Sequence, residues 1–219
     1  MSDPSSPGDS RSDSSGREVG LREHKKQQTR DAIARAATEL FASDGFGSVT
    51  VAQIARAANV SRQTVFNYFA TKEEMLFDRD SEVLDALLAS IRGRADGSLV
   101  DAFRGHTISF WRRIESGGDG DVAPAAFWRV VQSSPSLRDY AEVVFARHAR
   151  AVAGALADER ELPGDDPSCH ALARVLCSVN AAILTCGLDR IAAGQDAVEV
   201  AREMITEAGR AYDVIDGVK

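Results

Sequence analysis

The sequence predicts an all-α protein. Apolar residues recur at spacings of three and four along most of the 219 residues, which is the spacing of one helix face. Alanine, leucine and arginine are common, whereas aromatic residues make up only 6% of the chain. No stretch alternates Val, Ile, Thr or Tyr with polar residues as a half-buried strand does. Breaks rich in Gly, Pro, Ser and Asp then divide the chain into about nine predicted helices.

The N-terminal part predicts a tail followed by a long helix. Residues 1–20 are rich in Ser, Asp, Gly and Pro and cannot bury enough apolar surface to order themselves, so we expect a disordered tail. The first helix is expected over 22–43, and Gly45 is a suitable stop after it. Its buried stripe consists of Ile33, Ala36, Ala37, Leu40 and Phe41.

Residues 48–72 predict two short helices joined by a tight turn. Thr50 and Gln53 have the spacing of a capping box at the start of the first helix. Asn59 tolerates the left-handed backbone that ends a helix, and Ser61 is a natural N-cap for the second. The apolar face of the first helix consists of Val51, Ile54, Ala55 and Ala58.

The second short helix has one polar and one mostly apolar half. At 100° per residue, its polar half spans about 140° and its packing half covers about 200 to 340°. The polar half carries Arg62, Gln63, Phe66 and Asn67, and the packing half carries Thr64, Val65, Tyr68 and Phe69. Arginine pairs with guanine, and Asn or Gln with adenine, in the major groove. The segment therefore predicts a helix-turn-helix that reads DNA.

These residues resemble the DNA-binding domain of TetR-type transcriptional regulators. The resemblance runs from LFASDGF through TVAQIARAANVS to TKEEML and covers about the first third of the folded chain. Asn59 replaces a usual glycine, Phe66 a usual tyrosine, and Asn67 a common histidine. The resemblance implies a three-helix DNA-binding domain over 21–71 and a helical ligand-binding and dimerisation domain over 72–219.

The candidate DNA contacts divide into base and phosphate contacts. Arg62, Gln63 and Asn67 are expected to read base edges. The phosphate candidates are Lys25, Lys26, Arg30, Thr50, Tyr68 and Lys72, and Thr64 completes the predicted interface. The net charge of −7 is unevenly distributed: residues 21–72 hold eight Lys or Arg against four Asp or Glu, a local charge of +4. The positive charge therefore lies in the segment that would meet phosphate.

Six further helices are predicted after the helix-turn-helix. They are expected over 71–91, 98–116, 122–132, 136–158, 168–193 and 196–215. In the family, the first of these links the two domains, and the last two pair with their copies in a homodimer. Two-fold pairing would match a palindromic double-stranded operator.

The central third of the chain is where we expect a small-molecule cavity. Core packing accounts for most of the aromatic residues there, but Trp and Tyr also have polar groups that suit a binding site. The predicted lining is Phe103, His106, Thr107, Phe110, Trp111, Phe127, Trp128, Val131, Tyr140, Phe145, His148 and Asn180. The ligand itself cannot be identified from these residues.

The sequence gives no sign of catalysis. It lacks a Ser-His-Asp order, a glycine-rich phosphate loop and HExxH, so we expect no enzyme activity, metal or cofactor. Cys169, Cys177 and Cys186 lie about 12 and about 13.5 Å apart along one predicted helix, too far for disulfides within a chain. We see no signal peptide or apolar run of about 18 residues, which predicts a cytoplasmic protein without a membrane span.

The expected function is a repressor that a small-molecule ligand releases from its operator. Two alternatives stay open: an activator of the same fold, and an all-helical small-molecule carrier or enzyme that does not bind DNA.

Overall fold

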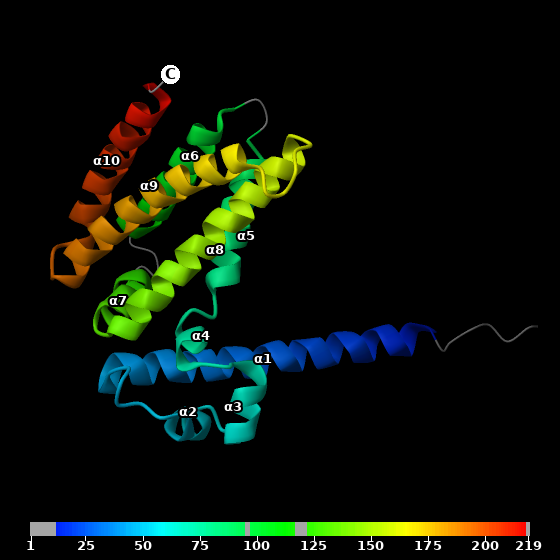
Figure 1. Cartoon of the computed structure of the whole chain (residues 1–219). Coiled ribbons are helices and arrows are strands. Elements are labelled where there is room, and N and C mark those ends of the chain that lie inside the picture. The colour runs from blue at the N-terminus through cyan, green and yellow to red at the C-terminus, as the bar shows by residue number, and fades with distance from the viewer. Residues whose placement is uncertain (1–11, 95–96, 117–121, 218–219) are drawn as a thin grey trace, which may run out of the picture.

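The computed structural model describes residues 12–94, 97–116 and 122–217, and within these ranges it contains ten α-helices and no strand (Figure 1). The helices are α1 Ser12–Asp44, α2 Val51–Ala57, α3 Arg62–Tyr68, α4 Lys72–Leu76, α5 Asp80–Arg92, α6 Leu99–Glu115, α7 Val122–Gln132, α8 Pro135–Glu159, α9 Pro167–Ala192 and α10 Ala197–Gly217. The predicted all-α class is confirmed.

Helix α1 starts earlier than predicted. It begins at Ser12, so residues 12–20, which the composition assigns to a disordered tail, are helical. Extending an existing helix adds one hydrogen bond for each residue fixed, which is far easier than starting a new helix. The N-terminal half of α1 projects beyond α2 and α3 (Figure 1). The rest of the predicted tail, residues 1–11, lies outside the described residues.

Helices α1 to α3 pack as the sequence predicts. Thr50 and Gln53 form both halves of the predicted capping box, and the Ser61 side chain accepts a hydrogen bond from the Thr64 amide at the start of α3. Asn59 adopts the left-handed conformation, with φ of 54°. Val65 of α3 is fully buried, so the opposite face of α3 points outward.

The predicted helix over 71–91 is instead two helices. Helix α4 ends at Leu76 and α5 begins at Asp80. Between them, the Asp80 amide donates a hydrogen bond to the Phe77 carbonyl at 3.0 Å, which is the tighter i to i+3 pattern. The apolar stripe of the sequence continues through this turn, which is why periodicity alone predicts one helix.

The C-terminal helices pack around α9. Helix α9 contacts α6, α7, α8 and α10, while α6 and α10 form a second close pair (Figure 1). One apolar cluster runs from Ile33 and Val65 through Met75 to Trp111 and Met204. A second cluster is centred on α5, α6, α8 and α9 and includes Tyr212 of α10.

Helix α9 is more apolar than predicted. An 18-residue window of it has a mean hydropathy of 1.7, so its length and composition would suffice for a membrane span, although a third of that window is buried inside the protein. We expect no unbroken apolar run of about 18 residues, and α9 has none because Arg174, Ser178 and Asn180 interrupt it. Its high mean hydropathy comes from the Ala, Val, Leu, Ile and Cys residues between them. The remaining apolar surface of α9 is unpaired in the monomer.

Candidate nucleic-acid interface and ligand cavity

Helix α3 presents a polar surface to solvent. Arg62, Gln63 and Asn67 are all exposed, as the helical count predicts for base-reading residues. The Gln63 amide donates a hydrogen bond to Asn67 Oδ1 at 3.1 Å, so the two carboxamides form one paired unit. Phe66 lies on the same face with 54% of its surface exposed.

The two threonines predicted at the interface lie at helix N-termini, Thr50 as the N-cap of α2 and Thr64 in the first turn of α3. Thr50 Oγ1 donates to Gln53 Oε1 at 2.7 Å, and its oxygen accepts from the Gln53 amide. Thr64 is half-buried, and its hydroxyl lies 2.8 Å from that of Ser61. These bonds hold the N-termini of α2 and α3, where orphan backbone amides favour an anion such as phosphate.

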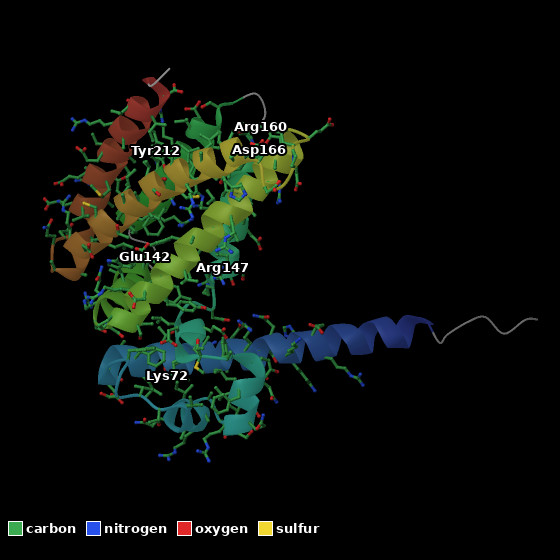
Figure 2. All side chains as sticks on the ribbon, viewed as in Figure 1. Lys72, Glu142, Arg147, Arg160, Asp166 and Tyr212 are labelled. Atoms are coloured by element: carbon green, nitrogen blue, oxygen red, sulfur yellow. The ribbon has the colours of Figure 1, made fainter. Side chains whose placement is uncertain are left out.

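Lys72 is turned inward at the start of α4 (Figure 2). Its ammonium group donates to the carbonyls of Phe46 at 2.7 Å and Val49 at 2.9 Å. It also lies 4.4 Å from the centroid of the Phe46 ring, a cation–π distance. Two of the three ammonium donors therefore hold the loop before α2, which leaves one for the predicted phosphate contact.

Arg30 also holds the domain together. Its Nε donates to Asp78 Oδ1 at 2.5 Å, its Nη1 donates to the Tyr68 carbonyl at 3.2 Å, and its guanidinium stacks 4.5 Å over the Phe69 ring. The sequence predicts a phosphate contact, but the structure ties Arg30 to α3 and to the turn after α4. Sequence spacing could not reveal this role, because the partners lie 38 and 48 residues away.

Lys25 and Lys26 remain exposed on α1, and Tyr68 is half-buried. The two lysines lie on the solvent face of α1, upstream of its contact with α2 and α4. They are the phosphate candidates with the most freedom to move toward a duplex.

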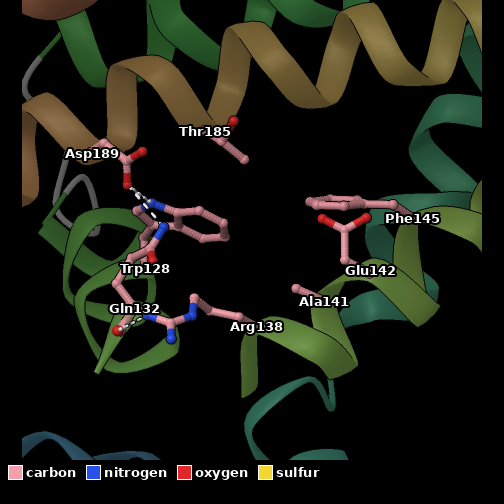
Figure 3. Close-up of a pocket in the computed structure, with 8 residues that line it drawn as sticks. All are labelled: Trp128, Gln132, Arg138, Ala141, Glu142, Phe145, Thr185 and Asp189. Atoms are coloured by element: carbon pink, nitrogen blue, oxygen red, sulfur yellow. Dashed lines mark hydrogen bonds between the residues drawn. The ribbon is translucent and has the colours of Figure 1, made fainter. Parts of the chain in front are cut away.

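A cavity of about 210 Å³ lies between α7, α8 and α9. Its lining consists of Trp128, Gln132, Arg138, Ala141, Glu142, Phe145, Thr185 and Asp189 (Figure 3). Figure 3 shows the rings of Trp128 and Phe145 on opposite sides, with Glu142 beside Phe145 and Arg138 beside Gln132. Asp189 accepts hydrogen bonds from Trp128 Nε1 at 2.6 Å and from Gln132 Nε2 at 3.0 Å.

Only two of the predicted ligand-binding residues, Trp128 and Phe145, line this cavity. The sequence missed the other six, of which Arg138, Glu142 and Asp189 read as ordinary surface charges. Their meeting point depends on how α7 and α8 pack on α9, which residue type does not reveal. The sequence does show that Arg138 and Glu142, four residues apart, lie on the same face of α8, and this spacing could have indicated that both contribute to one site.

Four of the remaining predicted residues belong to the core. Phe103, Thr107, Trp111 and Val131 are fully buried. Thr107 Oγ1 lies 2.7 Å from Asn180 Oδ1 and 3.0 Å from the Tyr212 hydroxyl, and these polar groups satisfy one another inside the apolar cluster. Burial raises the pKa of Tyr212 to about 12, so its hydroxyl stays neutral.

The last predicted residues lie on α6, α7 and α8, several of them near the turn between α4 and α5. Phe77, in the turn after α4, packs against Phe127 and Tyr140 with ring centroids 5.1 and 5.2 Å away. His148 Nε2 lies 2.6 Å from Asp80 Oδ1, and Arg147 binds the other carboxylate oxygen. Burial lowers the pKa of His106, and this histidine and Phe110 are both half-buried on α6.

Burial alone would raise the pKa of Asp80. The hydrogen bond and charge of His148, together with the Arg147 guanidinium, outweigh burial and hold that pKa below its ordinary value. Asp80 is therefore a stable carboxylate at neutral pH that joins the first turn of α5 to α8.

A segment of 46 residues that includes α2, α3 and α4 matches a known family. Residues 33–78 match the family described as bacterial regulatory proteins, tetR family. The chain is 35% identical over 122 residues to the HTH-type transcriptional regulator TcmR of Streptomyces glaucescens, a match that covers 54% of each protein. It is 33% identical over 125 residues to the putative mycofactocin biosynthesis transcriptional regulator MftR of Mycobacterium tuberculosis, covering 56% of this chain and 61% of that one. The matched segments thus span little more than half the length of these relatives.

Solved structures share the fold of almost the whole chain. A putative TetR-family regulator from Syntrophomonas wolfei has a TM-score of 0.61 at 15% identity and covers 89% of this chain and 100% of its own. NalD of Pseudomonas aeruginosa, a repressor of the MexAB-OprM multidrug efflux pump, has a TM-score of 0.55 at 18% identity and covers 84% of this chain and 97% of its own. The N-terminal segment thus matches the tetR family of bacterial regulatory proteins, and the chain as a whole shares the fold of solved TetR-family regulators.

Proposed function

We propose that the chain is a cytoplasmic, homodimeric transcriptional repressor that leaves its operator when a small molecule binds. The observation that carries the proposal is the exposed face of α3, where a guanidinium and two carboxamides project from a domain with a local charge of +4. These are the side chains that read guanine and adenine in the major groove. The named relatives are transcriptional regulators, which supports the same assignment.

The first experiment tests DNA binding directly. Purified protein is titrated with the duplex flanking its own gene and with a scrambled duplex of equal length, and fluorescence anisotropy is measured at several salt concentrations. We expect specific binding about 10³-fold or more tighter than non-specific binding. Equal affinity for both duplexes would reject the proposal. Placing the bound site over or upstream of the promoter then separates repression from activation.

We expect a dimer because a single α3 can contact only a short stretch of DNA. One recognition helix contacts only a few base pairs, so selective binding needs two half-sites about 34–36 Å apart or a multiple of that distance. The unpaired side of α9 supports this assembly: Ala171, Val175, Ser178, Ala182 and Cys186 form an exposed stripe of mostly small residues. Val214 of α10, 69% exposed, extends the apolar surface.

The α7–α9 cavity supports ligand control. Its aromatic walls and its mixture of guanidinium and carboxylate groups suit a small molecule with an apolar body and a polar or charged substituent. A volume of about 210 Å³ favours a compact ligand. An inducer should bind about tenfold less tightly when operator DNA is present, because coupling between two sites is reciprocal. Equal affinity in the two titrations would show that the compound is not the inducing signal.

A further inference from the structure

Phe66 is the large apolar side chain of α3 that the fold does not use. Its neighbours Val65 and Phe69 are buried to 0% and 1% exposure, whereas Phe66 is 54% exposed. An exposed aromatic ring on a short polar helix face contributes little to folding, since most of its surface stays in water. Its position therefore calls for a partner outside the monomer.

The side chains around Phe66 define the chemistry of that partner. Phe66 lies one turn after Arg62 and next to Asn67, in the middle of the polar face. Because the Gln63 amide donates to Asn67 Oδ1, the pair keeps Gln63 Oε1 as an acceptor and the Asn67 amide as a donor. Adenine offers the complementary N6 donor and N7 acceptor in the major groove.

The thymine opposite adenine has one apolar group on its major-groove edge, the C5-methyl, and no other base carries such a group there. A ring that stands beside an adenine-reading pair is placed to cover such a methyl on the same or the adjacent base pair. We propose that Phe66 reads a thymine C5-methyl and, with Gln63 and Asn67, makes each half-site select A·T pairs. This inference rests on the proposed DNA-binding function.

Deoxyuridine provides a direct test, because it lacks the methyl group and keeps every hydrogen-bonding group of thymine. Each thymine of the bound duplex is replaced in turn, and the Kd is measured for the full-length protein and for Phe66→Ala. We expect one or two positions in each half-site where deoxyuridine weakens wild-type binding about three- to tenfold. This is the change in Kd expected when one buried methyl group is lost. The same replacements should leave the Kd of Phe66→Ala unchanged.

Two variants control for indirect effects. Phe66→Tyr keeps the ring and should keep the sensitivity to deoxyuridine. Val83→Ala removes an apolar side chain of similar exposure, 51%, from α5 and should bind thymine and deoxyuridine duplexes as the wild type does. Phe66→Ala should unfold at the wild-type temperature, because the ring lies outside the core.

The outcomes separate this inference from the function on which it rests. Specific binding without any methyl-sensitive position, or with a sensitivity that survives in Phe66→Ala, would overturn the role of Phe66 and leave the repressor proposal intact. Absence of any specific binding by the wild type would overturn both.

Discussion

At the residue scale, Gly187 of α9 lies directly against the ring of Trp111 of α6. A Cβ built at Gly187 of α9 would come within 2.2 Å of the Trp111 ring, so only glycine allows α9 and α6 to pack with that buried ring between them. Trp111 is fully buried, and its indole N–H has no hydrogen-bond partner in the structure. The contact therefore depends on shape alone.

Gly187→Ala should destabilise the protein by about 1–3 kcal/mol, the usual cost of overpacking a core. Gly105→Ala is the matched control, since it also lies inside a helix but a Cβ there would meet nothing within 4 Å. It should be neutral or stabilising by up to about 1 kcal/mol, because alanine favours the helix. Urea denaturation measures both, and equal effects at the two positions would contradict this account.

A second residue-scale prediction concerns Asp80. Asp80→Asn removes a carboxylate that His148 and Arg147 both bind, and it should cost about 1.5–3 kcal/mol at neutral pH. Because the folded-state pKa of Asp80 is below its ordinary value, its contribution is fully present above the unfolded-state pKa. That contribution is lost as the pH falls through the folded-state pKa.

The difference in unfolding free energy between the wild type and Asp80→Asn should therefore shrink as the pH is lowered from 7 into the acidic range. Glu82→Gln serves as the control, because its ion pair with Arg79 is largely exposed and such pairs contribute little. A difference that stays constant or grows toward low pH would rule out this role for the carboxylate.

At the element scale, the turn between α4 and α5 forms ion pairs with α1 and with α8. Asp78 binds Arg30 of α1, and Asp80, two residues later, binds Arg147 and His148 of α8. The turn thus links α8 to α1 through two carboxylates, Asp78 and Asp80.

Arg30 and Asp78 should be energetically coupled. Burial raises the pKa of Asp78 even with Arg30 beside it, so removing Arg30 leaves a buried carboxylate without compensation. We expect Arg30→Gln and Asp78→Asn each to destabilise the fold and the double variant to cost less than their sum, by about 0.5–3 kcal/mol. Additive losses in denaturant titrations would show that the ion pair is incidental.

The DNA-binding part of the chain illustrates which features the sequence can predict and which it cannot. The starts of α2 and α3, the Thr50–Gln53 box and the outward face of α3 follow from caps and periodicity, which are properties of neighbouring residues. The sequence predicts phosphate contacts for Arg30 and Lys72 because both lie in or beside the helix-turn-helix domain. Within the chain they bind backbone carbonyls and a carboxylate from distant positions, and only the tertiary fold brings these groups within reach.

At the scale of the whole molecule, the exposed stripe of α9 is the surface on which the proposed dimer depends. Ala182→Glu should place a charge in the proposed two-fold contact and weaken dimerisation and operator binding together, since one half-site alone is a weak ligand. Ala86→Glu, at an exposed position of α5, should change neither. Sedimentation velocity and anisotropy on the same samples measure both effects. A monomer that still binds the full site tightly would contradict the dimer.

The apolar cluster that extends from Val65 beneath α3, through Met75, to Ala141 beside the cavity also has a thermodynamic consequence. The sequence divides the chain at residue 71, but buried side chains pack without interruption across that position. The two parts should melt as one cooperative unit rather than as separate domains. Operator DNA bound at α3 and a small molecule bound in the cavity should then each raise the melting temperature of this single transition, because each binds the folded state.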